Sequence, residues 1–175
     1  MLSANIHPKE IDLIQSYLND KKIMLEYGCG GSTTIFPKYV KEYYSIEHNL
    51  DWFWKVQQEL YDDNLLYASE NLNTNIPSFE DCVYPRDRYV WSEYIDYVDK
   101  LNVKLFDVVL IDGRARTDCA YKILKYIDKG SIVFIHDFWP RPEYHRVFEW
   151  YDEVVSIKDT QLGDGGQTIV GLKKK

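Results

Sequence analysis

Short apolar runs alternate with segments of helical periodicity along most of this chain of 175 residues. The runs have the length of β-strands, whereas apolar residues three and four positions apart indicate helices that pack one face against a sheet. The strands that we expect are residues 23–25, 43–46, 65–68, 106–111, 132–135, 154–157 and 168–172. The helices that we expect are one within residues 1–20, one that begins at Ser32 or Thr33, and residues 50–60, 90–101, 118–127 and 144–150.

The order of these elements predicts an α/β fold with a single domain over residues 1–175. Strands that alternate with helices form a mainly parallel sheet with helices on both faces, and the runs 106–111 and 132–135 are typical of strands buried on both faces. Ten residues without helical periodicity, 158–167, separate the last two strands. They are too few for a parallel crossover, so the last of the seven strands is expected to be antiparallel. The polar, turn-rich stretch 70–89 predicts a long loop near the site.

Composition narrows the classes of partner. A formal net charge of -7 argues against non-specific binding to nucleic acid, which needs a basic face. No stretch approaches the roughly 18 apolar residues that cross a bilayer, and the N-terminus lacks the pattern of a signal peptide. The three cysteines are scattered, without the spacing of metal ligands or of a disulfide framework. We therefore expect a cytoplasmic protein whose partner is neither nucleic acid nor membrane.

A glycine-rich turn after the first strand is the first candidate for chemistry. Gly28, Gly30 and Gly31 follow Glu26, and Glu47 ends the second strand about twenty residues later, as dinucleotide sites require. There a glycine-rich turn lets a cofactor approach the backbone, and the second acid accepts hydrogen bonds from ribose hydroxyls. Position 33 is a threonine, so the dinucleotide fingerprint G-x-G-x-x-G is incomplete.

The chain here resembles the class I S-adenosylmethionine (SAM)-dependent methyltransferases. Their first motif is an acidic residue, any residue, then Gly-x-Gly, and their Rossmann-like sheet ends in an antiparallel seventh strand. The resemblance implies a Rossmann-like three-layer sandwich that binds SAM. It also implies cofactor-binding roles for the following residues: Glu26, Gly28, Cys29, Gly30, Glu47, Ser69 and Asp112.

The second half of the chain resembles a subgroup of small bacterial-type methyltransferases, with Asp-Gly-Arg after strand four and His-Asp after strand five. Asp112 and the pair His136–Asp137 end two buried strands, so we expect all three in the cofactor crevice as catalytic residues. A histidine beside a carboxylate suits a general base that takes a proton from the acceptor. The alternatives are that His136 caps its strand, or that Asp112 and Asp137 hold Mg²⁺ or Mn²⁺. In metal-dependent relatives an asparagine stands at the position of Phe138, which cannot ligate.

All six arginines of the chain fall between residues 86 and 146. The planar guanidinium binds phosphate or carboxylate in bidentate fashion, which favours an anionic acceptor, although ion pairs with nearby acids explain the cluster equally well. Trp139 is expected to stack on a sugar or ring. The residues expected to bind the acceptor are Arg114, Arg116, Trp139, Arg141 and Tyr144.

The sequence thus predicts a SAM-dependent methyltransferase (EC 2.1.1.-) that methylates an oxygen of a small anionic or carbohydrate acceptor, such as a sugar nucleotide or a glycan end. The site is either open or completed by a second subunit in a homodimer. The alternatives are a nicotinamide-dependent oxidoreductase and a non-catalytic module that binds the cofactor without turning it over.

Overall fold

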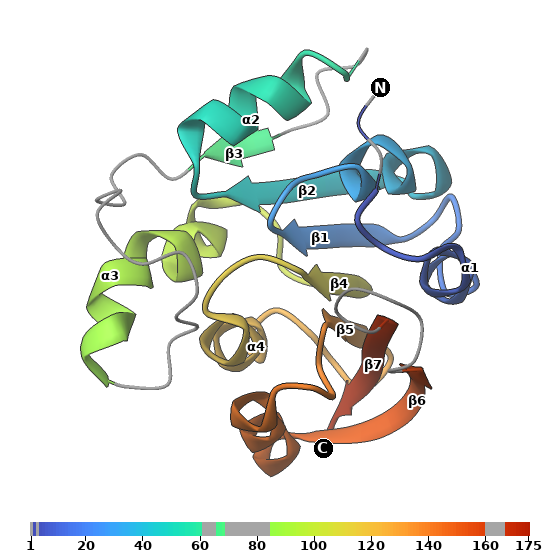
Figure 1. Ribbon diagram of the computed structural model, residues 1–175, viewed down its shortest axis with the longest axis vertical. Helices are drawn as coiled ribbons and strands as arrows, with labels where there is room; N and C mark the ends of the chain where they lie inside the picture. The colour runs from blue at the N-terminus through green and yellow to red at the C-terminus, as the bar shows by residue number, and fades with distance from the viewer. Residues whose placement is uncertain (1, 3, 61–65, 69–84, 160–166) are drawn as a thin grey trace.

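The computed structural model describes the chain except residues 1, 3, 61–65, 69–84 and 160–166 (Figure 1). Seven strands form one sheet in the order β3-β2-β1-β4-β5-β7-β6. The strands are β1 (Ile23–Tyr27), β2 (Glu42–Glu47), β3 (Leu66–Ala68), β4 (Val108–Ile111), β5 (Ile132–His136), β6 (Tyr151–Asp159) and β7 (Gln167–Lys174). The α-helices are α1 (Pro8–Gln15), α2 (Leu50–Gln57), α3 (Pro85–Asp96) and α4 (Arg116–Ile123). Shorter 3₁₀ helices are η1 (Ser32–Thr34), η2 (Phe36–Tyr39), η3 (Tyr97–Lys100) and η4 (Pro142–Glu149).

The sheet is mostly parallel and has one antiparallel reversal. Strands β1 to β5 pair in parallel, whereas β7 runs antiparallel to both β5 and β6. The expected antiparallel last strand is therefore confirmed. Its cause is the short connection after β6, which has room for a hairpin but not for a crossover helix.

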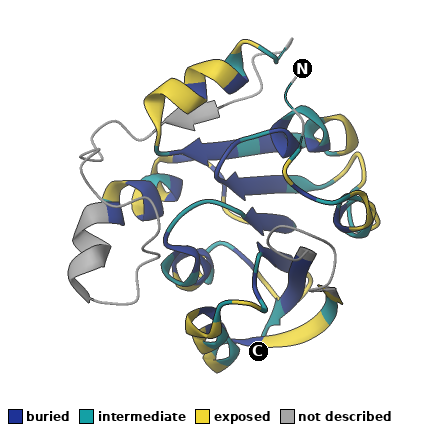
Figure 2. Cartoon of the chain, viewed as in Figure 1, coloured by how far each residue is buried: buried dark blue, intermediate teal, exposed yellow. Residues whose placement is uncertain are grey.

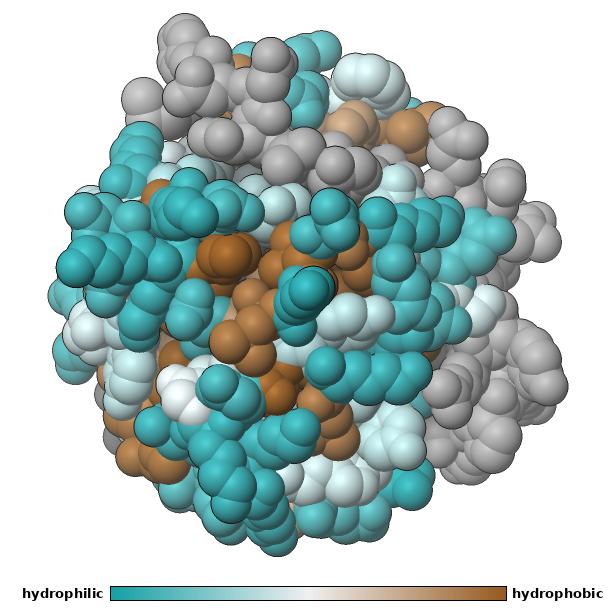
Figure 3. All heavy atoms as spheres, turned by 180° about the vertical axis from the view of Figure 1, so that it is seen from behind, coloured by the Kyte–Doolittle hydropathy of each residue, from teal (hydrophilic) through white to brown (hydrophobic). Residues whose placement is uncertain are grey.

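Helices cover both faces of the sheet. Alternate residues of the central strands point to opposite sides, so Val109 and Ile111 pack in one core with α3 and α4, whereas Val108 and Leu110 pack in the other with α1. All four residues of β4 and all five of β5 are buried, which confirms the prediction from their apolar runs. Figure 2 shows the central strands buried, whereas edge strand β6 is largely exposed. From behind, hydrophobic residues gather in the middle of the face and hydrophilic residues surround them (Figure 3).

Several helices differ from the sequence prediction. The segment after the glycine-rich turn forms only the 3₁₀ helices η1 and η2, because the Pro37 nitrogen cannot donate and the β-branched run Thr33–Ile35 disfavours an α-helix. Helix α3 begins at Pro85 rather than residue 90, since proline is favoured in a first helical turn. Residues 85–89 are therefore helical, and residues 70–84 of the expected loop lie outside the described part of the chain. The N-terminal helix is shorter than expected, and none of the described helices is long and apolar enough to cross a membrane.

Candidate active site

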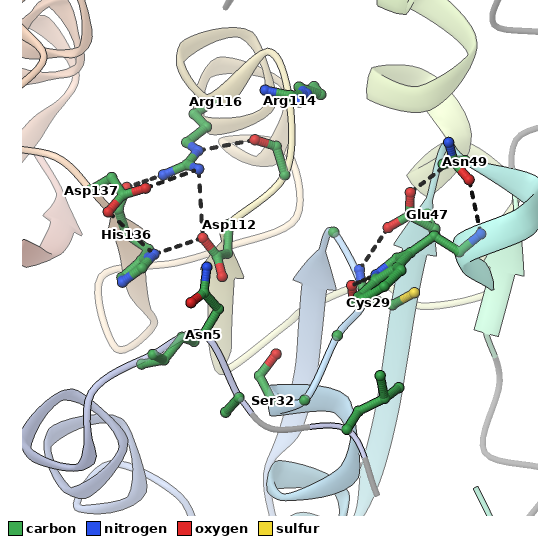
Figure 4. Close-up of a pocket in the computed structure, with 18 of the residues that line it drawn as sticks. Asn5, Cys29, Ser32, Glu47, Asn49, Asp112, Arg114, Arg116, His136 and Asp137 are labelled. Carbon is green, nitrogen blue, oxygen red and sulfur yellow. Dashed lines mark hydrogen bonds and ion pairs between the residues drawn. The ribbon is translucent and has the colours of Figure 1, made fainter. Parts of the chain in front are cut away.

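A cavity of about 1400 Å³ lies at the carboxyl ends of β1, β2, β4 and β5. Parallel strands that end at one edge bring together residues far apart in sequence, which is why ligands bind there in such sheets. The cavity wall has two parts, which Figure 4 shows on opposite sides. The β1–β2 half comprises residues 28–32, residues 47–49 and Trp52, and the β4–β5 half comprises residues 112–114, Arg116, His136, Asp137 and Arg141. Residues 4–8 and Glu10 from the N-terminal segment line the cavity as well.

The glycine-rich turn after β1 can fold as observed only with a glycine at position 28. Its φ is +92°, and a Cβ added there would lie 2.6 Å from the Cα of Gly113, in the turn after β4. The glycine therefore lets two strand-end turns pack together. Gly30 differs, because a Cβ added to it meets no atom within 4 Å. Gly30 lines the cavity, so it is the position where a ligand has room to approach the backbone.

Glu26 supports this turn from behind and is not among the residues that line the cavity. It is fully buried, and its carboxylate accepts hydrogen bonds from the hydroxyl groups of Ser32, Thr33, Tyr43 and Ser45. Burial raises its pKa to about 7, although these hydrogen bonds oppose the shift. The direct cofactor contact expected for Glu26 is therefore not supported by its position, and it stays a prediction. The residue lies within β1, so its side chain points to a face of the sheet and not to the edge.

Glu47 connects the end of β2 to the turn. Its Oε2 accepts a hydrogen bond of 2.9 Å from the backbone N–H of Cys29, and its Oε1 accepts from those of His48 and Asn49 at 2.9 and 2.7 Å. A carboxylate has about four lone-pair positions, so Oε2 keeps capacity for a donor from a ligand. Trp52, which the sequence did not single out as a site residue, donates from Nε1 to the Cys29 carbonyl at 2.7 Å.

The Cys29 thiol is nearly buried, and burial raises its pKa, so it stays protonated. Cys29 thus contributes its backbone to the wall. Ser69, expected near the adenine, lies outside the described residues.

The β4–β5 half is a charged network around His136. Its Nδ1 lies 2.8 Å from Asp112 Oδ1, and its Nε2 lies 3.3 Å from Glu10 Oε2. Burial alone lowers the pKa of His136, but the Asp112 carboxylate, with help from Glu10 and Asp137, raises it to about 10. The ring is then an imidazolium at neutral pH, with both N–H groups donating. In this form the ring has no lone pair with which to take a proton, which argues against the expected role of His136 as a general base.

Arg116 is the centre of the same network and is buried. Its Nε donates to the Gly113 carbonyl at 3.0 Å, its Nη1 donates to the His136 carbonyl, and its Nη2 lies 3.6 Å from a carboxylate oxygen of both Asp112 and Asp137. The side chain therefore holds the ends of β4 and β5 together. Arg116 also lines the cavity, and its expected role as a direct ligand of the acceptor stays a prediction.

The acids at this edge do not fit a divalent metal in the observed arrangement. Asp112, His136 and Asp137 each offer an atom within 4.8 Å of the others. However, the guanidinium of Arg116 already lies against both carboxylates, and His136 neutralises Asp112. A divalent cation would lie against a fixed positive charge, which costs free energy at this distance. The expected metal role of Asp112 and Asp137 is therefore not supported.

The other expected acceptor ligands separate into two groups. Arg114 and Arg141 line the cavity. Arg141 lies 3.8 Å from Asp137 and donates to the Tyr144 hydroxyl at 3.2 Å, whereas the side chain of Arg114 has no hydrogen bond or ion pair among the described residues. Tyr144 is buried beneath Arg141, where it does not reach the cavity.

Trp139 also lies away from the cavity. It packs against Phe138, His145 and Phe148, with the Lys158 ammonium 3.7 Å from its ring centre. Its expected stacking on an acceptor is therefore not supported by its position, because these contacts already occupy the ring. Asp137, two residues before Trp139, has a left-handed backbone with φ of 51°, which turns the chain at this point.

No protein family and no curated protein matches the chain at the level of sequence. Solved structures do match it in fold. A methyltransferase-like protein from Silicibacter pomeroyi is 19% identical with a TM-score of 0.69, over 99% of this chain and 90% of that one. An rRNA methylase from Streptococcus thermophilus is 16% identical with a TM-score of 0.60, over 98% and 99%. The N-methyltransferase NodS from Bradyrhizobium japonicum, solved with S-adenosylhomocysteine (SAH), is 11% identical with a TM-score of 0.61, over 95% and 86%. The chain therefore has the Rossmann-like fold of the class I SAM-dependent methyltransferases.

Proposed function

We propose that the protein is a SAM-dependent methyltransferase. The observation that carries the proposal is the β1–β2 half of the cavity. There Gly30 has open space beside its backbone and Glu47 is buried, at the edge of a sheet whose strand β7 is antiparallel. Glu47 would accept hydrogen bonds from the ribose hydroxyls, and the backbone at Gly30 would allow the methionine part to approach. When bound, the cofactor supplies a methyl group on a sulfonium centre.

The acceptor in this proposal is a small anionic molecule or carbohydrate that is methylated on oxygen. A cavity of about 1400 Å³ exceeds the roughly 300–1000 Å³ of usual ligand pockets, which gives room for a cofactor and a small acceptor together. Arg114 lines it without an ion-pair partner among the described residues, so its guanidinium is available to an anion.

Asp137 is the residue that we assign to proton transfer. An acceptor hydroxyl loses its proton as its oxygen attacks the methyl carbon, and His136 already carries both protons. Among the carboxylates around His136, the side chain of Asp137 is 30% exposed, against 20% for Asp112 and 0% for Glu10. Asp137 is therefore the acid that an acceptor reaches most readily, while Asp112 and Arg116 orient the network.

An acceptor screen that follows SAH release tests this function. Sugar acids, sugar nucleotides and neutral sugars are incubated with the protein and SAM. We expect turnover of an anionic member and its loss in Asp137→Asn, with the matched surface variant Asp152→Asn unaffected. Preference for a neutral sugar over its anionic relative, or full activity in Asp137→Asn, would refute these assignments.

A further inference from the structure

Glu10 is a buried acid that reaches the β4–β5 half of the cavity from outside the sheet. It lies in the first turn of α1, and its side chain has an exposed fraction of 0% although it lines the cavity. Its Oε2 accepts a hydrogen bond of 3.0 Å from the backbone N–H of His7, which completes the cap of the helix, and lies 3.3 Å from His136 Nε2. The Oε2 atom of Glu10 therefore has two partners.

The other oxygen of Glu10 has no partner. Oε1 is buried and makes no hydrogen bond within the described part of the chain. A buried carboxylate oxygen without a donor loses its hydration and gains nothing in return, so native structures nearly always supply a partner. Glu10 is one of the residues that line the cavity, and another is Asn5, which Figure 4 shows beside Asp112. The missing donor is therefore expected to come from a molecule in the cavity.

We propose that Glu10 is a specificity residue whose Oε1 accepts a hydrogen bond from a hydroxyl or ammonium group of the acceptor. The inference rests on the proposed function and makes the acceptor class narrower. Arg114 binds an anionic group, and Glu10 requires a donor group on the same molecule. A sugar acid satisfies both, whereas an anion without hydroxyl or ammonium groups satisfies only the first.

The N-terminal segment takes part in this recognition. Oε1 has almost no exposed surface, and residues 4–8 border the same part of the cavity. A ligand donor therefore reaches Oε1 only when the residues around this atom rearrange. Because the Glu10 carboxylate also contacts His136, the acceptor's donor group would come to lie next to the imidazolium and close to Asp137.

Two probes that differ in their hydroxyl groups test the proposal in protein saturated with SAH. D-Glucuronate carries a carboxylate and hydroxyls, and cyclohexanecarboxylate carries the carboxylate alone. The variant Glu10→Gln keeps an oxygen for the contacts with His7 and His136 but replaces the unpartnered oxygen by a donor. Asp12→Asn is the matched control, because Asp12 lies exposed on the same helix.

We expect the wild type and Asp12→Asn to bind glucuronate about tenfold more tightly than cyclohexanecarboxylate by titration calorimetry, the scale of one hydrogen bond to a charged group. Glu10→Gln should reduce that ratio to near one, while its Kd for SAH and its Tm stay near those of the wild type. Equal affinities of the wild type for both probes, no binding of either, or a ratio unchanged in Glu10→Gln would overturn the inference. If SAH itself does not bind, the proposed function fails before this test begins.

Discussion

The two halves of the cavity are built from different chemical groups. The β1–β2 half consists largely of backbone: Gly28 and Gly30 shape it, and the single carboxylate of Glu47 accepts hydrogen bonds from three N–H groups of the main chain. The β4–β5 half consists of charged side chains, and with Glu10 these come from three parts of the sequence, with His136 and Arg116 between three carboxylates. A backbone site suits a cofactor that is the same in every cycle, and a charged side-chain network suits selection of an acceptor.

The largest effect that we expect separates folding from binding within the turn. Gly28→Val places a branched side chain at positive φ against the backbone of Gly113, which should cost about 4 kcal/mol or more in unfolding free energy. Gly30→Ala should change stability by less than about 0.5 kcal/mol, because its methyl group enters open space, yet weaken SAH binding. Denaturant unfolding and SAH titration of both variants check this. A stable Gly28→Val would show that the two turns do not pack as described.

Substitution of two arginines in the β4–β5 half should affect different properties, stability in one case and ligand binding in the other. Arg116→Lys loses hydrogen bonds to the carbonyls of Gly113 and His136 and should lower the unfolding free energy by about 2–3 kcal/mol. Arg114→Lys should leave stability within about 0.5 kcal/mol of the wild type and weaken binding of an anionic ligand such as glucuronate. Equal stability of the two variants would contradict the structural role of Arg116.

Glu47 gives the matching test in the β1–β2 half. Glu47→Ala removes the charged acceptor for ribose hydroxyls and should weaken SAH binding by about 1.5–3 kcal/mol. The variant also leaves backbone N–H groups without a partner, so its stability must be measured beside its affinity. The exposed acid Asp51, on the helix that follows, offers the control Asp51→Asn. Comparable losses of affinity in both variants would argue that only overall charge matters.

A pH titration tests the charge state of His136. Its pKa is raised from 6.5 to about 10, so the stabilisation from its protonated form is complete below about pH 6.5 and is lost as pH rises toward 10. The unfolding free energy of the wild type should therefore fall over this window relative to that of His136→Gln. A difference between the two proteins that stays constant from pH 6.5 to 10 would show that His136 does not hold its proton.

The smallest effect concerns divalent metals. Because Arg116 already lies against Asp112 and Asp137, Mg²⁺ or Mn²⁺ at about 5 mM should leave the Tm unchanged. A cation that bound the folded protein at this concentration would raise the Tm. A rise in Tm on adding either metal, reversed by chelator and absent in Asp137→Asn, would show that the network rearranges to hold a cation.

The sequence predicted the β1–β2 half better than the β4–β5 half, for a physical reason. Glycines and an acid at strand ends act through local backbone geometry, so Gly30 and Glu47 could be placed by spacing alone. Parallel topology likewise brought Asp112, His136 and Asp137 to one edge. Strand alternation, however, turns Glu26 away from the cavity.

The spacing of residues along the sequence could not reveal which side chains contact one another in the folded protein. The aromatic cluster around Trp139 assembles from η4 and the segment before it, and the charge of His136 depends on Asp112 and also on Glu10, 126 residues earlier in the chain. In the sequence Glu10 looks like an ordinary acid in a first helical turn, which is the role that its bond to His7 also fills.

Calorimetric titration of the purified protein with SAH, and separately with NADH, tests the central claim most directly. The account predicts that SAH binds to one site per chain, that Gly30→Ala weakens it, and that NADH gives no binding heat. Absence of SAH binding by the wild type, or binding of NADH as tight as that of SAH, would contradict the assignment of the β1–β2 half to the methyl-donor cofactor.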